Sequence, residues 1–163
     1  MLVNNAGVML LGPVEGADTE HWRRMVEVNL LGLLYCTHAA LPLMRERGAG
    51  DVINVSSVAG RHANAGSAVY NMTKFGVHAL SEGLRQEVTT SGIRVGIVAP
   101  GYVETELQGH NTDAVKGTID KMKEKIGDVL QPEDIADAMV YALTRPRHVG
   151  LNEILVRPAG QER

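Results

Sequence analysis

The sequence of 163 residues has few cysteines, few aromatic residues and no large excess of charge. Its single cysteine, Cys36, excludes an internal disulfide and a cysteine-based metal cluster, and we expect this small side chain to be buried. A net charge of −3 offers neither a basic surface for nucleic acid nor a polybasic membrane patch. The opening apolar run, residues 1–3, is too short for a signal peptide or a membrane span. We therefore expect a cytoplasmic protein with no nucleic-acid or membrane partner.

Short β-branched runs alternate with longer helical segments. Residues 52–55 are typical of a strand that is covered on both faces. Asp18 is a candidate helix cap, and Pro132 stands where prolines open helices. We expect strands at 2–5, 51–57, 93–99 and 152–156 and helices at 18–44, 67–90, 113–126 and 132–144. This alternation predicts an α/β fold, a parallel sheet of about four strands with crossover helices, in a single domain over residues 1–163.

Small or polar residues follow three of the expected strands. They are Asn4-Asn5-Ala6-Gly7, Ser56-Ser57 and Pro100-Gly101. Ligands of open parallel sheets bind at the carboxyl ends of the strands, so these clusters are candidates for one binding edge. Any one cluster could instead be ordinary turn chemistry, because the same residue types favour turns.

Tyr70 and Lys74 lie one turn apart on the second long helix, and Ser57 ends the preceding strand. A phenol exchanges protons poorly at neutral pH, and a nearby ammonium lowers its pKa. A serine hydroxyl could hold a substrate oxygen while the tyrosine exchanges its proton, which suits a carbonyl that gains hydride and proton together. The tyrosine–lysine pair alone is a weak signal, since it could be a surface pair, and Ser57 makes it specific.

These motifs, together with Val28-Asn29 and Asn54-Val55 before Ser56, resemble the short-chain dehydrogenase/reductase family over essentially all 163 residues. The resemblance implies a Rossmann-like doubly wound sheet and hydride transfer between a nicotinamide cofactor and a carbonyl or secondary alcohol. It implies Tyr70 as acid/base, Ser57 as the group that orients the substrate oxygen, and Lys74 as the group that lowers the phenol pKa. Asn29 would help to hold a proton-relay water at a helix bulge.

The resemblance also implies the cofactor site. Lys74, beside Tyr70, would bind the nicotinamide ribose; the other residues of the site would be Asn5, Ala6, Gly7, Pro100, Gly101, Val103 and Thr105. The ending 152–158 and the segment 11–15 are similar to an NADP-preferring bacterial subgroup that includes clavulanic acid dehydrogenase. We therefore expect NADP, with NAD not excluded, and a small-molecule substrate. The apolar helix 30–44 and the family resemblance imply a homo-oligomer, a dimer or a tetramer.

The sequence departs from the family pattern in one respect. Family members begin with a strand, a Gly-rich turn and a helix that hold the pyrophosphate, and two further strands follow. None of the eighteen glycines stands in a Gly-x-x-x-Gly-x-Gly motif. We expect the first strands to be absent, through a mis-assigned start or a shortened chain, with strand 2–5 as an exposed edge and with weakened cofactor binding and activity.

Two alternatives stay open at this stage. The chain could be a non-catalytic fragment that acts through self-association or pairing with a full-length paralogue. It could also be a hydrolase with Ser57 as nucleophile and Lys74 or His62 as base, although no Gly-x-Ser-x-Gly elbow surrounds Ser57. The six histidines show no metal-ligand spacing, so we expect no metal site. Asn64, with His62, is a candidate for substrate contact, and residues 103–130 are a candidate lid.

Overall fold

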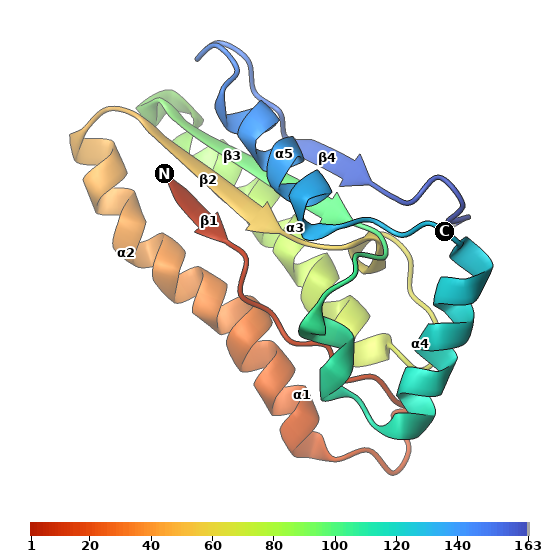
Figure 1. Ribbon diagram of the computed structural model, residues 1–163. Helices are drawn as coiled ribbons and strands as arrows, with labels where there is room; N and C mark the ends of the chain where they lie inside the picture. Colours follow the sequence, from red (N-terminus) through yellow and green to blue (C-terminus); the bar gives the residue numbers. More distant parts are fainter. Residues whose placement is uncertain (163) are drawn as a thin grey trace.

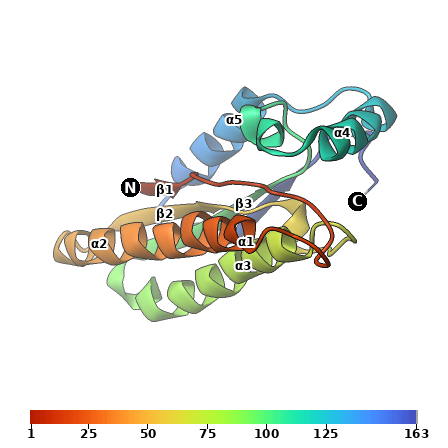
Figure 2. The ribbon, with the colours of Figure 1, turned by 90° about the horizontal axis from the view of Figure 1, so that it is seen from below.

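The computed structural model describes residues 1–162 and contains one parallel sheet with helices on both faces (Figures 1 and 2). The strands are β1 (Leu2–Asn4), β2 (Gly50–Val55), β3 (Ile93–Pro100) and β4 (Glu153–Val156). They are hydrogen-bonded in the order β1-β2-β3-β4, and every neighbouring pair is parallel. The predicted α/β class and the four predicted strands are confirmed. All four carboxyl ends meet at one edge of the sheet.

The helices form two layers around this sheet (Figure 2). They are α1 (Thr19–Val26), α2 (Leu33–Glu46), α3 (Ala68–Val88), α4 (Asp113–Ile126) and α5 (Pro132–Leu143), and a π-helical segment (Glu27–Gly32) joins α1 to α2. The first three helices cover one face, whereas α5 covers the other face and α4 lies beyond the carboxyl edge. The expected helix starts hold: Asp18 accepts a hydrogen bond from the Glu20 amide at 2.9 Å, and Pro132 opens α5.

Two apolar clusters hold the layers together. Val52, Val88 and Val95 are among the residues that join the sheet to α2 and α3, and each of the three is almost fully buried. Ile53 and Val98 point to the opposite face and pack against α5. Successive side chains of a strand alternate between the two faces, so an unbroken apolar run supplies both clusters at once.

A buried chain of polar side chains crosses the layer between the sheet and the helices. The Asn4 amide donates to Thr37 Oγ1 at 3.1 Å and to Asn54 Oδ1 at 2.8 Å. Asn54 in turn donates to Ser81 Oγ at 2.8 Å, and Ser81 donates to the Val77 carbonyl. These bonds link β1, β2, α2 and α3, so each buried polar group is satisfied inside the core.

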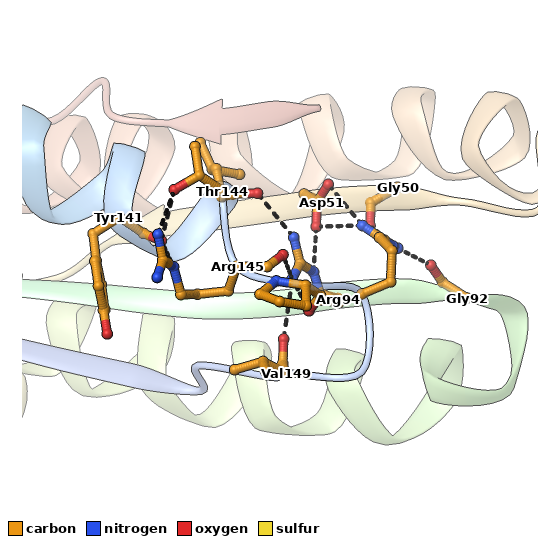
Figure 3. Close-up of polar contacts among 11 residues, drawn as sticks. Gly50, Asp51, Gly92, Arg94, Tyr141, Thr144, Arg145 and Val149 are labelled. Carbon is orange, nitrogen blue, oxygen red and sulfur yellow. Dashed lines mark hydrogen bonds and ion pairs between the residues drawn. The ribbon is translucent and has the colours of Figure 1, made fainter.

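The amino-terminal edge of the sheet is held by a cluster of charges (Figure 3). Arg94 Nε donates to Asp51 Oδ1 at 2.7 Å, and Arg147 Nη1 lies 2.9 Å and 3.0 Å from the two oxygens of the same carboxylate. The Arg94 guanidinium also donates to the carbonyls of Leu143, Arg145, Pro146 and Val149. Arg94 therefore caps the end of α5 and fixes the loop that leads to β4.

Helix α2 differs from the expectation at Cys36, which is exposed rather than buried. Leu33, Thr37 and Met44 are the buried residues of this helix, and their spacing of four and seven residues puts them on one face and turns position 36 away from the sheet. The helical stretch Thr19–Glu46 is long enough to cross a membrane and contains an 18-residue window with a mean hydropathy of 1.3. Core helices of soluble α/β proteins meet the same criteria, and here the stretch packs on β1, β2 and α3.

Candidate active site

A cavity of about 1480 Å³ opens at the carboxyl edge of the sheet. Its walls come from the strand ends, the loop 62–67, the start of α3, the segment 100–108 and the inner side of α4. The predicted site residues that line it are Asn5, Ala6, Gly7, Ser57, Tyr70, Lys74, Pro100, Gly101, Val103 and Thr105. Parallel pairing brings three separate strand ends together, so residues far apart in sequence share one wall.

Tyr70 and Ser57 meet in this cavity. Tyr70 is in the first turn of α3 and is 6% exposed. Ser57 caps the short 3₁₀ turn Val58–Gly60, and its Oγ accepts a hydrogen bond from the Ala59 amide at 3.1 Å. Burial raises the pKa of Tyr70 to about 12, and a side-chain hydrogen bond with Ser57 partly offsets that rise.

Lys74 lies one turn further along α3, with Nζ 5.8 Å from the centre of the Tyr70 ring. Nζ donates to the Val55 carbonyl at 3.1 Å, and burial lowers the pKa of Lys74 to about 8. Burial is the larger cause and raises the pKa of Tyr70 overall, while the Ser57 hydrogen bond lowers it. A lowering of the phenol pKa by Lys74 stays a prediction.

Asn29 lies in the π-helical segment, behind the cavity wall, and is 2% exposed. Its amide exchanges two hydrogen bonds with the Val8 backbone, at 2.8 Å and 2.9 Å, and donates to Thr73 Oγ1 at 3.1 Å. The predicted helix bulge is thus present, and Asn29 ties it to the segment after β1. A Cβ atom at Gly7 would lie 3.5 Å from Asn29 Oδ1 and 3.8 Å from Lys74 Nζ, so the backbone passes close to both groups.

Asn71 is a site residue that the sequence reasoning missed. It is 2% exposed and uses its whole side-chain amide on the loop that follows Ser57. It donates to the carbonyls of Ala59 and His62, both at 2.8 Å, and accepts from the Asn64 amide and from Ser67 Oγ. Asparagine is unfavourable inside a helix, so an asparagine directly after Tyr70 indicates a side chain with a specific hydrogen-bonding role. This was the signal in the sequence that could have identified Asn71.

The segment 103–130, which we predicted to be a lid, forms part of the cavity wall. Thr105 caps a 3₁₀ turn, Glu106–His110, and accepts from the Leu107 amide at 3.3 Å. Val103 forms an isolated bridge with Leu130, which closes the two ends of the segment. The candidate substrate residues His62 and Asn64 both line the cavity. Within residues 1–162 no group of three or more histidine, cysteine or carboxylate side chains is placed to hold a metal.

The residues present fit the nicotinamide end of a dinucleotide. Lys74 Nζ has three N–H donors, and the hydrogen bond to Val55 uses one of them. Because Gly7 has no side chain, its backbone lies close to the Lys74 ammonium. No glycine-rich turn of the kind that holds a pyrophosphate follows a strand in the described part of the chain.

Comparison with known proteins gives the class. The family model described as short chain dehydrogenase matches residues 1–116, and the chain therefore belongs to that family. An uncharacterized oxidoreductase of Staphylococcus aureus (strain USA300) is 38% identical over 97% of this chain, and the matched region is 64% of its own length. The chain thus spans about 64% of the curated relatives that it matches.

The chain is similar to solved structures of dehydrogenases, some of them with NADP bound. A closed form of serine dehydrogenase complexed with NADP+ superimposes with a TM-score of 0.92 at 36% identity, over 99% of this chain and 66% of that one. A serine dehydrogenase from Escherichia coli gives 0.82 at 34% identity over 99% of this chain and 65% of that one. A gluconate 5-dehydrogenase from Burkholderia cenocepacia in complex with NADP and tartrate gives 0.80 at 28% identity, over 95% and 62% of the two chains.

Proposed function

We propose that the protein is an NADP-dependent oxidoreductase that transfers a hydride between the nicotinamide and a carbonyl compound or secondary alcohol. The observation that carries the proposal is the meeting of Ser57, Tyr70 and Lys74 at the carboxyl edge of the sheet. Similar structures with bound NADP support this cofactor, and NAD is not excluded. Residues 1–162 supply the nicotinamide end of the proposed cofactor site.

Each residue has a separate role in the proposed reaction. The Ser57 hydroxyl donates to the substrate oxygen and holds it against the phenol of Tyr70. Because the pKa of Tyr70 is raised to about 12, the phenol is protonated at neutral pH and can donate its proton to the oxygen of a reduced carbonyl. The bound cofactor supplies the hydride. Lys74 holds the ribose hydroxyls, and Asn29 fixes the π-helical segment beside the proton path. Asn5, Ala6, Gly7, Pro100, Gly101, Val103 and Thr105 form the rest of the cofactor wall.

The proposed assembly is a cytoplasmic homo-oligomer that pairs through α2 and α3. Both helices expose large apolar side chains: Leu34, Tyr35 and Leu43 on α2 and Met72 and Phe75 on α3. Exposed apolar faces of this kind mark protein interfaces. The same face, together with β1 at the edge of the sheet, supports the alternative of a fragment that acts only by self-association.

Replacement of Tyr70 by phenylalanine tests the function. The test measures NADPH binding by fluorescence and NADPH-dependent reduction of a ketone by the 163-residue chain. We expect Tyr70→Phe to retain binding and to reduce kcat at least about 100-fold, since general acid catalysis contributes on that order. The exposed Tyr141, changed in the same way, is the matched control. Equal turnover in Tyr70→Phe, or an absence of NADPH binding, contradicts the proposal.

A further inference from the structure

We infer that the substrate is an uncharged carbonyl compound or secondary alcohol with apolar substituents, and not a carboxylate such as serine or gluconate. This inference rests on the proposed function and deepens it. The names of the similar structures point to two substrates that each carry a carboxylate. Within residues 1–162 the cavity lining has no arginine, and its one lysine is the residue that the proposed reaction uses for the cofactor.

The charged groups of the cavity do not suit an anion. Among residues 1–162 no arginine lines it, and its single lysine is Lys74. Lys74 donates to the Val55 carbonyl and lies next to Tyr70, where the proposed reaction uses it for the cofactor. The carboxylate of Glu106 also lines the cavity, and because this side chain is exposed its repulsion of a second anion is weak. A substrate carboxylate would therefore enter without a cationic partner, which is the costly way to bury a charge.

The arginines near the cavity are not placed to pair with a substrate carboxylate. Arg61 follows the serine loop but donates to Glu153 Oε1 at 2.7 Å. Arg157 lies beside Gly101, where an added Cβ atom would be 3.1 Å from Arg157 Cγ, yet Arg157 is exposed and does not line the cavity. The cavity histidines, His62 and His110, are also exposed to solvent, where a charge partner contributes little.

Apolar side chains form much of the cavity wall. They come from three separate segments: Met9 and Leu11 after β1, Val58 and Ala59 after Ser57, and Val115, Ile119 and Met122 on α4. Met9, Leu11 and Ala59 also pack in the apolar cluster that contains Tyr70. A ketone whose oxygen reaches Ser57 would place its carbon substituents in this cavity, where burial of apolar groups is favourable.

The reaction in this inference is balanced by NADPH and one proton. Ketone, NADPH and one proton give secondary alcohol and NADP+: the hydride forms the new C–H bond, and the Tyr70 proton forms the O–H bond. Nothing in this step uses a substrate carboxylate. Discrimination between substrates then depends on whether the cavity favours an uncharged or a charged substituent beside the carbonyl group.

A matched pair of substrates tests the inference. Ethyl acetoacetate and acetoacetate carry the same ketone, and they differ in an uncharged ester against a carboxylate. We expect the 163-residue chain to reduce the ester with at least about tenfold higher kcat/KM. Saturation-transfer NMR on the same two ligands, with and without NADPH, gives a second readout that does not need turnover. We expect saturation of the ester and little of the acid.

Met122 provides the reciprocal variant, because it lines the cavity yet is 47% exposed and can be replaced by a solvated charge. We expect Met122→Lys to raise kcat/KM for acetoacetate relative to the ester by only about two- to fivefold, because an exposed charge contributes little, and the uncharged Met122→Gln to leave that ratio unchanged. Selective binding of the ester without turnover supports the inference and contradicts the proposed function. Equal or stronger binding or reduction of acetoacetate by the unaltered chain, or binding of neither ligand, overturns the inference.

Discussion

Asn111 and Leu11 are joined by a hydrogen bond across 100 residues of sequence: the Leu11 amide donates to Asn111 Oδ1 at 2.7 Å. The Asn111 amide completes the pair by donating to the Met9 carbonyl at 2.9 Å. Asn111 is 7% exposed and lies between a 3₁₀ turn and α4. The Asn111 side chain thus pairs with the segment after β1 as a neighbouring strand would. It joins two segments that both line the cavity.

Loss of this pairing should loosen the closure. We expect Asn111→Ala to remove about 1–3 kcal/mol of local stability, because two backbone groups lose their partner. Amide hydrogen exchange at Leu11 should then be faster by about tenfold or more. The exposed Asn152, replaced by alanine, is the control. Unchanged exchange at Leu11 in Asn111→Ala would show that other contacts hold the two segments together.

Lys74 should make stability depend on pH. Its folded-state pKa of about 8 lies below the ordinary 10.5, so the unfolded chain binds the additional proton between these values and stability rises with pH across that window. The buried ammonium costs about 3 kcal/mol below pH 8 on this shift. We expect Lys74→Met to be about 1–3 kcal/mol more stable at pH 7 and to lose that rise.

Urea unfolding from pH 7 to pH 10 measures the effect, with Lys121→Met on exposed α4 as the control. Tyr70 acts in the opposite direction at higher pH. Its pKa is raised from 10 to about 12, so the stability it contributes is present below pH 10 and is lost as pH rises toward 12. A Lys74→Met chain that keeps the wild-type slope between pH 8 and pH 10 would argue against the buried ammonium.

Asn71 should organise the loop after Ser57. Alanine at this position removes four hydrogen bonds and leaves two buried or half-buried carbonyls, those of Ala59 and His62, without a partner. We expect a loss of about 2–4 kcal/mol in the free energy of unfolding. Proteolysis within residues 59–67 should become faster. Asn71→Asp keeps the two acceptor bonds but sets a buried carboxylate oxygen against the Ala59 and His62 carbonyls, so it should lose at least as much stability as Asn71→Ala. A clearly smaller loss in Asn71→Asp would show that the two donor bonds are not needed.

Asp51 should hold two arginines at the amino-terminal edge of the sheet (Figure 3). Arg94 is only 16% exposed in its side chain, so Asp51→Asn leaves a largely buried guanidinium without its counter-charge. We expect a destabilisation of about 1–3 kcal/mol in thermal or urea unfolding. The exposed ion pair of Lys125 with Glu162 is the comparison, and Glu162→Gln should change stability by less than about 1 kcal/mol. Similar small effects of both changes would remove Asp51 from a structural role.

Tyr35 should lie in a contact between two copies of the chain. It is 67% exposed on α2, among other exposed apolar side chains. We expect concentration-dependent dimers or larger species by sedimentation, and Tyr35→Glu should weaken them because an unpaired carboxylate is costly in an apolar contact. Tyr141→Glu alters an exposed tyrosine on α5, in the other helical layer, and should leave assembly unchanged. A folded monomer at high concentration would contradict the proposed assembly.

Part of the site follows from sequence because its signals are local. Spacing alone puts Tyr70 and Lys74 on one helix face, and strand ends alone put Ser57 at the sheet edge. Burial is not local. The raised pKa of Tyr70 and the exposed Cys36 both depend on which elements cover those positions, and pattern reasoning wrongly predicted a buried Cys36.

By itself the sequence determined the order of strands and helices, because apolar periodicity, caps and proline positions act within a few residues. It also determined that Ser57, Tyr70 and Lys74 belong to one site. Only the tertiary structure decided that Asn111 meets Leu11, that Asn71 holds the serine loop, and that the cavity wall is largely apolar. These contacts join residues from separate elements, and their partners are set by how the layers pack rather than by any local pattern.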